Sequence, residues 1–528
     1  MAVTETPADA IAGSTPTEEP TIRVEPSGLA AVLGSGDHKV LGRLFVGASL
    51  LFGLIVAGLG QLFAIEMLDT ESLDIFGADR VGAAFTFYRF GLLLVVAAPL
   101  MIGLAYIVVP LQVGSRSIAL PRAAALAFWG WLLGAFSFAA AAALTSGSDG
   151  SETAQLLYLT SVGLITVTLV VASICLATTV ITLRHPGVDM LRVPVFSWSV
   201  LVSSVVWILS LPVLLAIMVL RYVDLRHAGG AIAATGTATV SPDWVIRNPQ
   251  VYAVAIPVLG YAADVLSSTA RTRIAPRSVV FGAIGLFGVL SLGGFLYTAG
   301  IDELETPGVV AMALLAVLPA LAVLGLIGDL FRRGSFRMNA PVAHAVVALL
   351  VLVLGLLAGA IGAVPATEAT GTIYEIGVSH AILLSAIIAV FGGLHWWATK
   401  VGQQPANDKL GLLAPVVLLA GTVAVVGGDL ASGLLGENNE LSPDWTGGME
   451  VANIAVAVGT AVVILGLVIA AVSLLPMLKR PDEPAPADPW EGQSLEWLAP
   501  SPPPLANFDE DLPEVRSAEP LTDIREEK

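Results

Sequence analysis

Residues 342–363 read VAHAVVALLVLVLGLLAGAIGA, a run of 22 residues that contains no Asp, Glu, Lys or Arg. As an α-helix such a run is about 33 Å long, enough to cross a bilayer core of roughly 30 Å. The whole 528-residue chain has the same character, because 56% of its residues are hydrophobic and only 13% are charged. Globular proteins carry about 25% charged residues. The sequence therefore predicts an all-α polytopic membrane protein.

Further runs of this kind predict a bundle of twelve transmembrane helices. The expected spans are 43–66, 84–110, 122–145, 156–183, 196–221, 244–266, 278–299, 308–330, 342–363, 373–399, 411–435 and 450–476. Two acidic segments flank the expected twelve-helix domain, residues 37–480. Residues 1–36 have the composition of a disordered leader, and residues 481–528 form a Pro-rich tail that we expect to be extended over the protein surface or disordered.

Loop charges predict the orientation in the membrane. The loops after expected helices 2, 4, 6, 8 and 10 hold twelve Lys and Arg residues, and the opposite loops hold four. Because positive loops stay in the cytoplasm, we expect a multi-pass protein of the cell membrane with both termini cytoplasmic. The net charge of −17 provides no basic surface for nucleic acid, and the single Cys175 excludes a disulfide framework.

Several short motifs occur in order along the chain. They are DHK at 37–39 with Gly42-Arg43, PLQVG at 110–114, PVFSW at 194–198, LEW at 495–497 and SPPP at 501–504. Together they resemble subunit I of the haem–copper oxidases, the catalytic subunit of cytochrome c oxidase, in its actinobacterial form. The resemblance implies a twelve-helix bundle of the cytochrome c oxidase subunit I type. It also implies two haems, copper, reduction of O₂ and proton uptake.

The resemblance locates six histidine ligands, and no such position holds His in this chain. The haem positions hold Tyr88, Gly377 and Ser379, and the copper positions hold Asn248, Gly294 and Phe295. The family's proton-route residues are replaced as well, by Gln250, Ser117 and Val323. We therefore expect a degenerate member with no catalytic residue, no metal site and no bound haem or copper. Phe295 and neighbouring Leu side chains should then fill the space of the missing groups.

Two histidines are weak candidates for haem binding. His380 lies one residue past a family ligand position, and one residue is about 100° of helix rotation, so we expect it to point away from the site. His395 is fifteen residues further on, about 22 Å along a helix, so the two cannot share a metal.

Four other residues bear on the former site. Trp244 and Tyr252 resemble retained family residues beside the lost copper ligand, and we expect a structural role for Tyr252. Asp264 is expected to be a capped or solvated helix end. Asp429, deep in an expected span, is a possible functional charge, because buried ionisable groups in membranes are expensive.

The functional prediction combines the resemblance with the losses. We expect a pseudoenzyme, a structural or partner subunit of the respiratory chain that associates with oxidase-type subunits II and III in the bilayer. One alternative is a functional or accessory terminal oxidase subunit with non-standard ligands. A second is a transporter that reuses the bundle with Asp429 as its ion-coupling group, although no inverted repeat is visible in the sequence.

Overall fold

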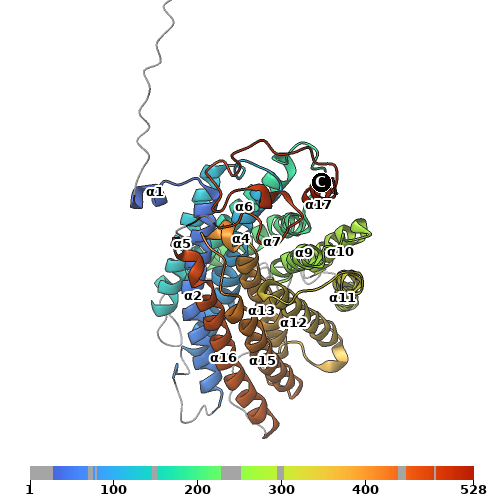
Figure 1. Ribbon diagram of the computed structural model, residues 1–528. Helices are drawn as coiled ribbons and strands as arrows, with labels where there is room; N and C mark the ends of the chain where they lie inside the picture. The colour runs from blue at the N-terminus through green and yellow to red at the C-terminus, as the bar shows by residue number, and fades with distance from the viewer. Residues whose placement is uncertain are drawn as a thin grey trace, which may run out of the picture. The chain divides into compact units, whose positions relative to one another are not determined.

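The computed structural model describes residues 28–68, 75–77, 80–144, 152–227, 251–293, 302–437, 447–480, 483 and 485–527. The chain divides into two compact units, Met1–Ser35 and Gly36–Lys528. In the described part of the first unit there is one short helix, α1 (Leu29–Leu33). The second unit, as far as it is described, is built of helices and loops without a β-strand (Figure 1).

The long helices follow the expected spans closely. They are α2 (His38–Glu66), α3 (Val81–Phe90), η1 (Gly91–Ala97), α4 (Ala98–Gln112), α5 (Pro121–Leu144), α6 (Glu152–Thr182), α7 (Val195–Arg226), α9 (Val251–Ala270), α10 (Arg277–Leu290), α11 (Asp302–Arg333), α12 (Ala340–Gly362), α13 (Tyr374–Trp396), α15 (Asp408–Leu434) and α16 (Gly447–Leu474). Within the described residues, eleven spans are long enough to cross a membrane and α10 is a shorter apolar helix. The prediction of an all-α twelve-helix membrane bundle is confirmed, with residues 244–250 of the sixth expected span and 294–299 of the seventh outside the described residues.

The second span is one continuous helix, α3, η1 and α4, in which residues 91–97 form a π-helix. Pro99 lies two residues after it, and a proline inside a helix lacks the N–H for the usual bond and clashes with the carbonyl four residues earlier. A wider turn before the proline accommodates both effects. Together with α9, this span is among the most deeply buried of the bundle, with 94% of its apolar window covered, against 28% for α16.

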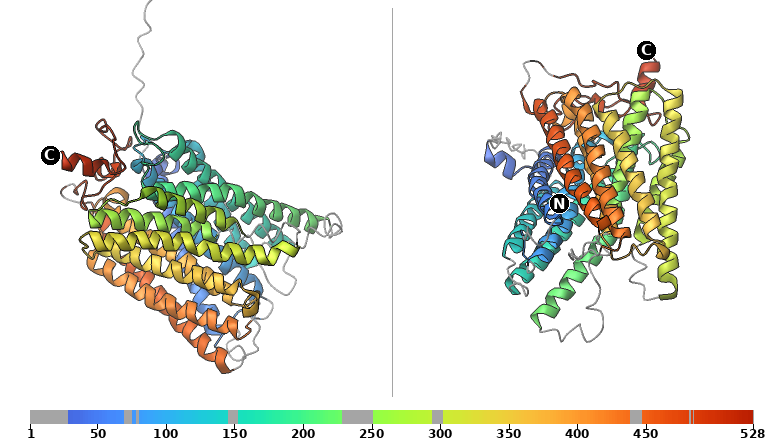
Figure 2. Two further views of the ribbon diagram at one scale, coloured as in Figure 1. Left: turned by 90° about the vertical axis from the view of Figure 1, so that its right-hand side faces the viewer. Right: turned by 90° about the horizontal axis from the view of Figure 1, so that it is seen from below.

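Helices that follow one another in the chain mostly pack side by side, as α12 with α13 and α15 with α16 do (Figures 1 and 2). Small residues permit the closest approaches. A Cβ on Gly421 of α15 would lie 2.6 Å from the backbone nitrogen of Val463 on α16. Such close backbone contacts are a main source of helix association in a bilayer.

The C-terminal tail lies across the helix ends at one end of the bundle, which we call the tail face (Figures 1 and 2). Its short helices are η8 (Leu495–Leu498) and α17 (Pro520–Glu526). The side chains of Leu495, Trp497 and Leu521 are buried. The Trp490 indole donates a hydrogen bond of 2.8 Å to the carbonyl of Trp396, the last residue of α13. The described part of the tail is therefore folded onto the bundle.

Candidate functional site

Three of the singled-out residues meet inside the bundle. Tyr88 of α3 and His380 of α13 are joined by a hydrogen bond of 2.8 Å between the phenol oxygen and Nε2. The other ring nitrogen of His380, Nδ1, lies 2.7 Å from Oδ2 of Asp429 on α15. The His380 and Asp429 side chains are 12% and 5% exposed. The result is a buried chain from phenol to imidazole to carboxylate, which we call the Tyr–His–Asp cluster.

The expectation that His380 points away from the second span is wrong, because the side chain contacts Tyr88 there. Gly377 and His380 are three residues apart, so they share one face of α13, and that face meets α15. Ser379 is rotated from this face by about 100°. Its hydroxyl bonds the carbonyl of Glu375, and its side chain borders a different cavity.

At Gly377 the two helices α13 and α15 nearly touch. A Cβ built on Gly377 would lie 2.7 Å from the Cβ of Asp429, closer than real Cβ contacts allow. The backbone nitrogen of Leu430 would be 3.4 Å away. A side chain as large as imidazole at this family ligand position would therefore require the two helices to separate.

An apolar cavity of about 300 Å³ lies beside the cluster. Tyr88 and His380 are its polar lining residues, together with Thr460 of α16. Its apolar walls come from α2, η1, α4, α13, α15 and α16. Leu51 and Leu54 also border it, and they are 57% and 63% exposed on the outer side of α2. The cavity therefore reaches the surface of the bundle that an apolar bilayer would cover.

The remaining predicted site residues lie elsewhere or outside the described residues. Tyr252 of α9 borders a smaller cavity of about 90 Å³ with Ser379, and its hydroxyl would be 3.2 Å from a Cβ on Gly359. His395 is buried at the other end of α13, where Nδ1 is bonded to the Phe391 carbonyl and Nε2 to the Ser473 hydroxyl. The calls on Trp244, Asn248, Gly294 and Phe295, including cavity filling by Phe295, fall outside the described residues.

A second polar cluster occupies the tail face, and sequence motifs far apart in the chain supply it. Gln112, from PLQVG, donates from its amide nitrogen to Asp264 and to Glu496 of the tail, both at 3.2 Å. Its amide oxygen accepts a bond of 2.7 Å from Ser197 of PVFSW. The Trp397 indole also donates to Glu496. The motif residues are thus parts of one network that holds the tail.

Asp264 does more than end its own helix. Its two carboxylate oxygens each accept a bond of 3.0 Å from a backbone N–H at the start of α7, those of Val195 and Phe196. Carboxylates are favoured at helix N-termini because they satisfy unpaired N–H groups and the helix dipole. The expectation of a capped or solvated helix end missed this role, because the partner helix is distant in sequence.

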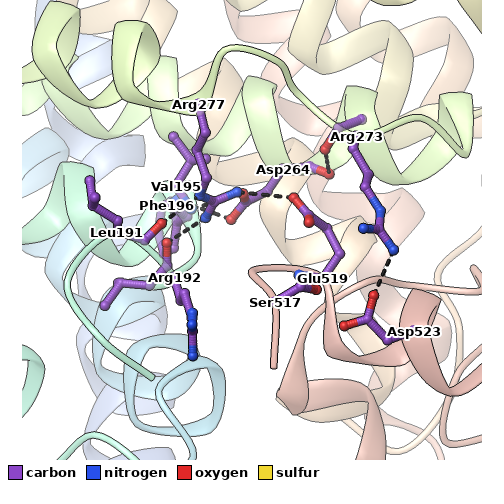
Figure 3. Close-up of polar contacts among 12 residues, drawn as sticks. Leu191, Arg192, Val195, Phe196, Asp264, Arg273, Arg277, Ser517, Glu519 and Asp523 are labelled. Carbon is purple, nitrogen blue, oxygen red and sulfur yellow. Dashed lines mark hydrogen bonds and ion pairs between the residues drawn. The ribbon is translucent and has the colours of Figure 1, made fainter. Parts of the chain in front are cut away.

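Ion pairs extend the tail contact along the tail face (Figure 3). Arg277 of α10 pairs with Glu519 of the tail at 3.2 Å and donates to the carbonyls of Leu191 and Val193. Arg273 pairs with Asp523 of α17 at 2.6 Å. Arg277 and Glu519 are only 17% and 10% exposed, so this pair is screened less by solvent than the exposed pairs are.

Two lysines anchor the tail at further points. Lys39, from DHK, donates to the amide oxygen of Asn507 at 2.9 Å, and His38 contacts the same oxygen at 2.9 Å. Lys400, in α14 (Ala398–Val401), donates to the Ala499 carbonyl and to the hydroxyl of Ser501. The DHK and SPPP motifs are therefore also contacts between bundle and tail.

Burial shifts the pKa values of two charged groups at the tail contact. Desolvation, and secondarily the charge of Asp264, raises the pKa of Glu496 to about 7. Desolvation lowers the pKa of Lys400 to about 8, although Glu496 and Asp488 oppose the shift. Among the described residues, Oε2 of Glu496 is a buried oxygen without a hydrogen-bond partner. The tail contact is therefore sensitive to the protonation of this carboxyl group.

Among the described residues, the imidazole that lines the apolar cavity is that of His380. In that part of the chain no group of three or more His, Cys, Asp or Glu side chains could hold a metal ion. The His380 imidazole, the ring facing the cavity, already has both nitrogens within hydrogen-bond distance of Tyr88 and Asp429. A haem iron would have to displace one of these contacts before His380 could bind it.

Comparisons with known proteins give a consistent family assignment. Residues 40–469 match the family described as Cytochrome C and Quinol oxidase polypeptide I. The putative cytochrome c oxidase subunit 1-beta of Streptomyces coelicolor is 27% identical over 97% of this chain and 93% of its own. The heme-copper oxidase subunit I+III of Aeropyrum pernix is 26% identical over 93% of this chain and 63% of its own.

A solved chain shares the fold. It comes from the cryo-EM structure of a heme-copper terminal oxidase dimer, with a TM-score of 0.69, 13% identity and 85% of both chains covered. The matches contradict one expectation, that of a chain without haem or copper, because the matched family is that of the haem–copper oxidases. Replacement of the aligned histidines is therefore not sufficient to predict a chain without haem or copper. His380 lies one residue from an expected ligand position, and its imidazole still faces α3 from α13.

Proposed function

Because the chain belongs to the cytochrome c and quinol oxidase polypeptide I family, we propose that it is a cytochrome c oxidase subunit I-like membrane protein with a structural or partner role, and that oxygen reduction is performed by another subunit. The observation that carries the proposal is the close contact at Gly377. There a Cβ would meet Asp429 at 2.7 Å, so the position cannot accept the family's imidazole in this arrangement of helices.

The buried network at the tail face supports the proposal that this chain is retained for its folded structure. Gln112, Ser197 and Glu496 form one buried network, and none of the three has a place in the Tyr–His–Asp cluster. Because the tail is engaged with its own bundle, the proposed contacts with oxidase-type subunits II or III use membrane-embedded helix faces. The name of the Aeropyrum relative, subunit I+III, indicates that a chain of this kind can be joined to another subunit.

The proposal includes the chain's organisation and its place in the cell. We assign residues 1–36 to a leader, residues 37–480 to the membrane domain and residues 481–528 to the tail, with the tail face in the cytoplasm of a cell-membrane protein. Single cysteines at Arg116, 80% exposed on the tail face, and at Glu152, 59% exposed at the opposite end, test this orientation. A membrane-impermeant maleimide should label only Glu152→Cys in intact cells, because the natural Cys175 is buried.

Purification of the full chain from its own membranes in mild detergent tests the function. We expect stoichiometric recovery of oxidase-type subunits, and no oxygen consumption with reduced cytochrome c or a quinol once a histidine-complete subunit I has been removed. A tagged, unrelated polytopic protein controls for non-specific recovery. Oxygen consumption by the isolated chain would contradict the proposal.

One observation favours a second candidate function, a catalytic oxidase subunit with other ligands. His380 projects from α13 toward α3 and α15 beside an apolar cavity, where its imidazole could serve a cofactor if the bonds to Tyr88 or Asp429 were exchanged. In that case the isolated chain consumes oxygen, and His380→Leu abolishes the activity.

A further inference from the structure

The cavity beside the Tyr–His–Asp cluster has the form of a site for an amphiphile. Its walls are apolar side chains such as Leu50, Leu384 and Leu467, and its polar groups are gathered at Tyr88 and His380 apart from Thr460. A ligand that fills it needs a long apolar body and one small polar end. Sites that take small lipophilic molecules combine an apolar lining with a few placed polar groups in this way.

The polar end of the cavity lies near the starts of two helices, at the end of the bundle opposite the tail. Tyr88 is seven residues from the start of α3 and His380 six from the start of α13, about 10 Å from the end of the bundle opposite the tail. The cavity extends from there toward Phe391 and Val472, nearer the tail face. A molecule with its polar end at Tyr88 would thus have the same direction as the lipids of that leaflet.

The entrance also faces the bilayer. Leu51 and Leu54 of α2 and Val468 and Val472 of α16 all border the cavity and are 43–63% exposed on the outside of the bundle. A ligand can therefore enter between α2 and α16 from the lipid phase without crossing water. This lateral entrance favours a molecule that is already dissolved in the membrane.

The cluster selects the chemistry of the polar end. If His380 is neutral and donates from Nδ1 to Asp429, its Nε2 accepts the Tyr88 proton, and the phenol oxygen can accept one more bond. If His380 is protonated, it donates to the phenol oxygen, and Tyr88 can donate to a ligand. A hydroxyl group both donates and accepts, so it satisfies Tyr88 in either state, whereas a carbonyl or an ether satisfies it in only one.

We propose that this cavity binds a membrane-soluble molecule with a hydroxyl head and an apolar chain, with the head bonded at the Tyr88–His380 pair. The inference is independent of whether the chain is catalytic. Such a hydroxyl belongs to an isoprenoid alcohol. A quinol, which the family's description names, carries hydroxyl groups as well, and a separate probe distinguishes it.

Geranylgeraniol, its methyl ether and decylubiquinol are suitable probes, added to the full chain after delipidation and measured as retained ligand by native mass spectrometry. We expect geranylgeraniol to bind about three- to tenfold more tightly than its ether, the range of one net hydrogen bond. The double variant Tyr88→Phe/His380→Leu should remove this preference. Binding of the quinol as well as the alcohol identifies a general hydroxyl site, whereas binding of the quinol alone would overturn the proposal in favour of a site for the family's own substrate.

A variant that fills the cavity provides a second measurement of probe binding and leaves the Tyr–His–Asp cluster unchanged. Ala57 of α2 lines the cavity, and Ala57→Phe should abolish binding of all three probes. Gly47 lies on the same helix with open space around it, so Gly47→Phe is the matched control and should bind as the unmodified chain does. Equal binding of alcohol and ether, unchanged binding in Ala57→Phe, or a haem absorption band that disappears in Ala57→Phe would each overturn the proposal.

Discussion

The tail face and the Tyr–His–Asp cluster are both buried and polar, but they are built differently. At the tail face many groups form one hydrogen-bond network. In it, Asp264, Gln112 and Glu496 connect several helices and the tail. In the cluster three side chains form a single line beside a cavity. The comparison indicates that the loss of one side chain at the tail face leaves other contacts in place, whereas the loss of one side chain in the cluster breaks the line.

The largest loss of stability is expected at Gly377, where α13 contacts α15 beside Asp429 of the cluster. Gly377→Leu places a side chain against Asp429, where even a Cβ is too close, so the α13–α15 contact should lose about 3 kcal/mol or more. Unfolding in mixed detergent micelles measures the loss. Gly427→Leu is the matched control, because no atom lies within 4 Å of a Cβ at that position on α15. If both variants lose the same stability, the contact at Gly377 is not tight.

A change at the tail face should be nearly as severe. Asn507 accepts from Lys39 and donates 2.7 Å to the Ser115 carbonyl, so Asn507→Ala leaves a buried ammonium short of an acceptor. We expect about 2 kcal/mol weaker tail docking, seen as faster proteolysis of the tail. Leu505→Ala, at a side chain that is 78% exposed, should leave the rate unchanged. Equal rates in the two variants would mean that the tail is held elsewhere.

Docking of the tail should depend on pH through Glu496. Burial raises the pKa of Glu496 to about 7, from an ordinary value near 4.5, so the docked tail binds the proton more tightly than the free tail. This contribution to docking is therefore complete below about pH 4.5 and is lost as the pH rises through about 7.

Glu496→Gln keeps a neutral group that accepts from Trp397 and adds an N–H at the position of the unpaired oxygen. At pH 8 it should strengthen docking by about 1–2 kcal/mol and flatten the proteolysis profile between pH 5 and 8. The difference between the variant and the unmodified chain should become smaller as the pH falls from 8 to 5. A profile that Glu496→Gln leaves unchanged would assign the pH dependence to another group.

How much the sequence predicts differs between the two regions for a physical reason. Hydropathy predicts the spans because each must cross the bilayer. The motifs containing Gln112 and Ser197 indicate the family by their sequence, and in the structure these two residues are hydrogen-bonded to each other. The cluster depends on helix rotation. An offset of one residue in α13 decides whether His380 or Ser379 faces Tyr88, and only packing, such as the contact at Gly377, determines it. Its signal in the sequence was the i, i+3 spacing of Gly377 and His380.

The smallest effect is expected from an ion pair with one of the shortest distances. Arg271 lies 2.6 Å from Glu491 of the tail, but the two side chains are 69% and 57% exposed. Water and salt screen such a pair, and ordering two long side chains costs entropy, so Arg271→Ala should weaken tail docking by less than about 0.5 kcal/mol. Arg277→Ala, which removes the more buried pair with Glu519 and two bonds to carbonyls, should weaken it more. Faster tail proteolysis in Arg271→Ala than in Arg277→Ala would contradict this. The strength of tail docking would then depend on ion-pair distance and surface charge, and not on burial.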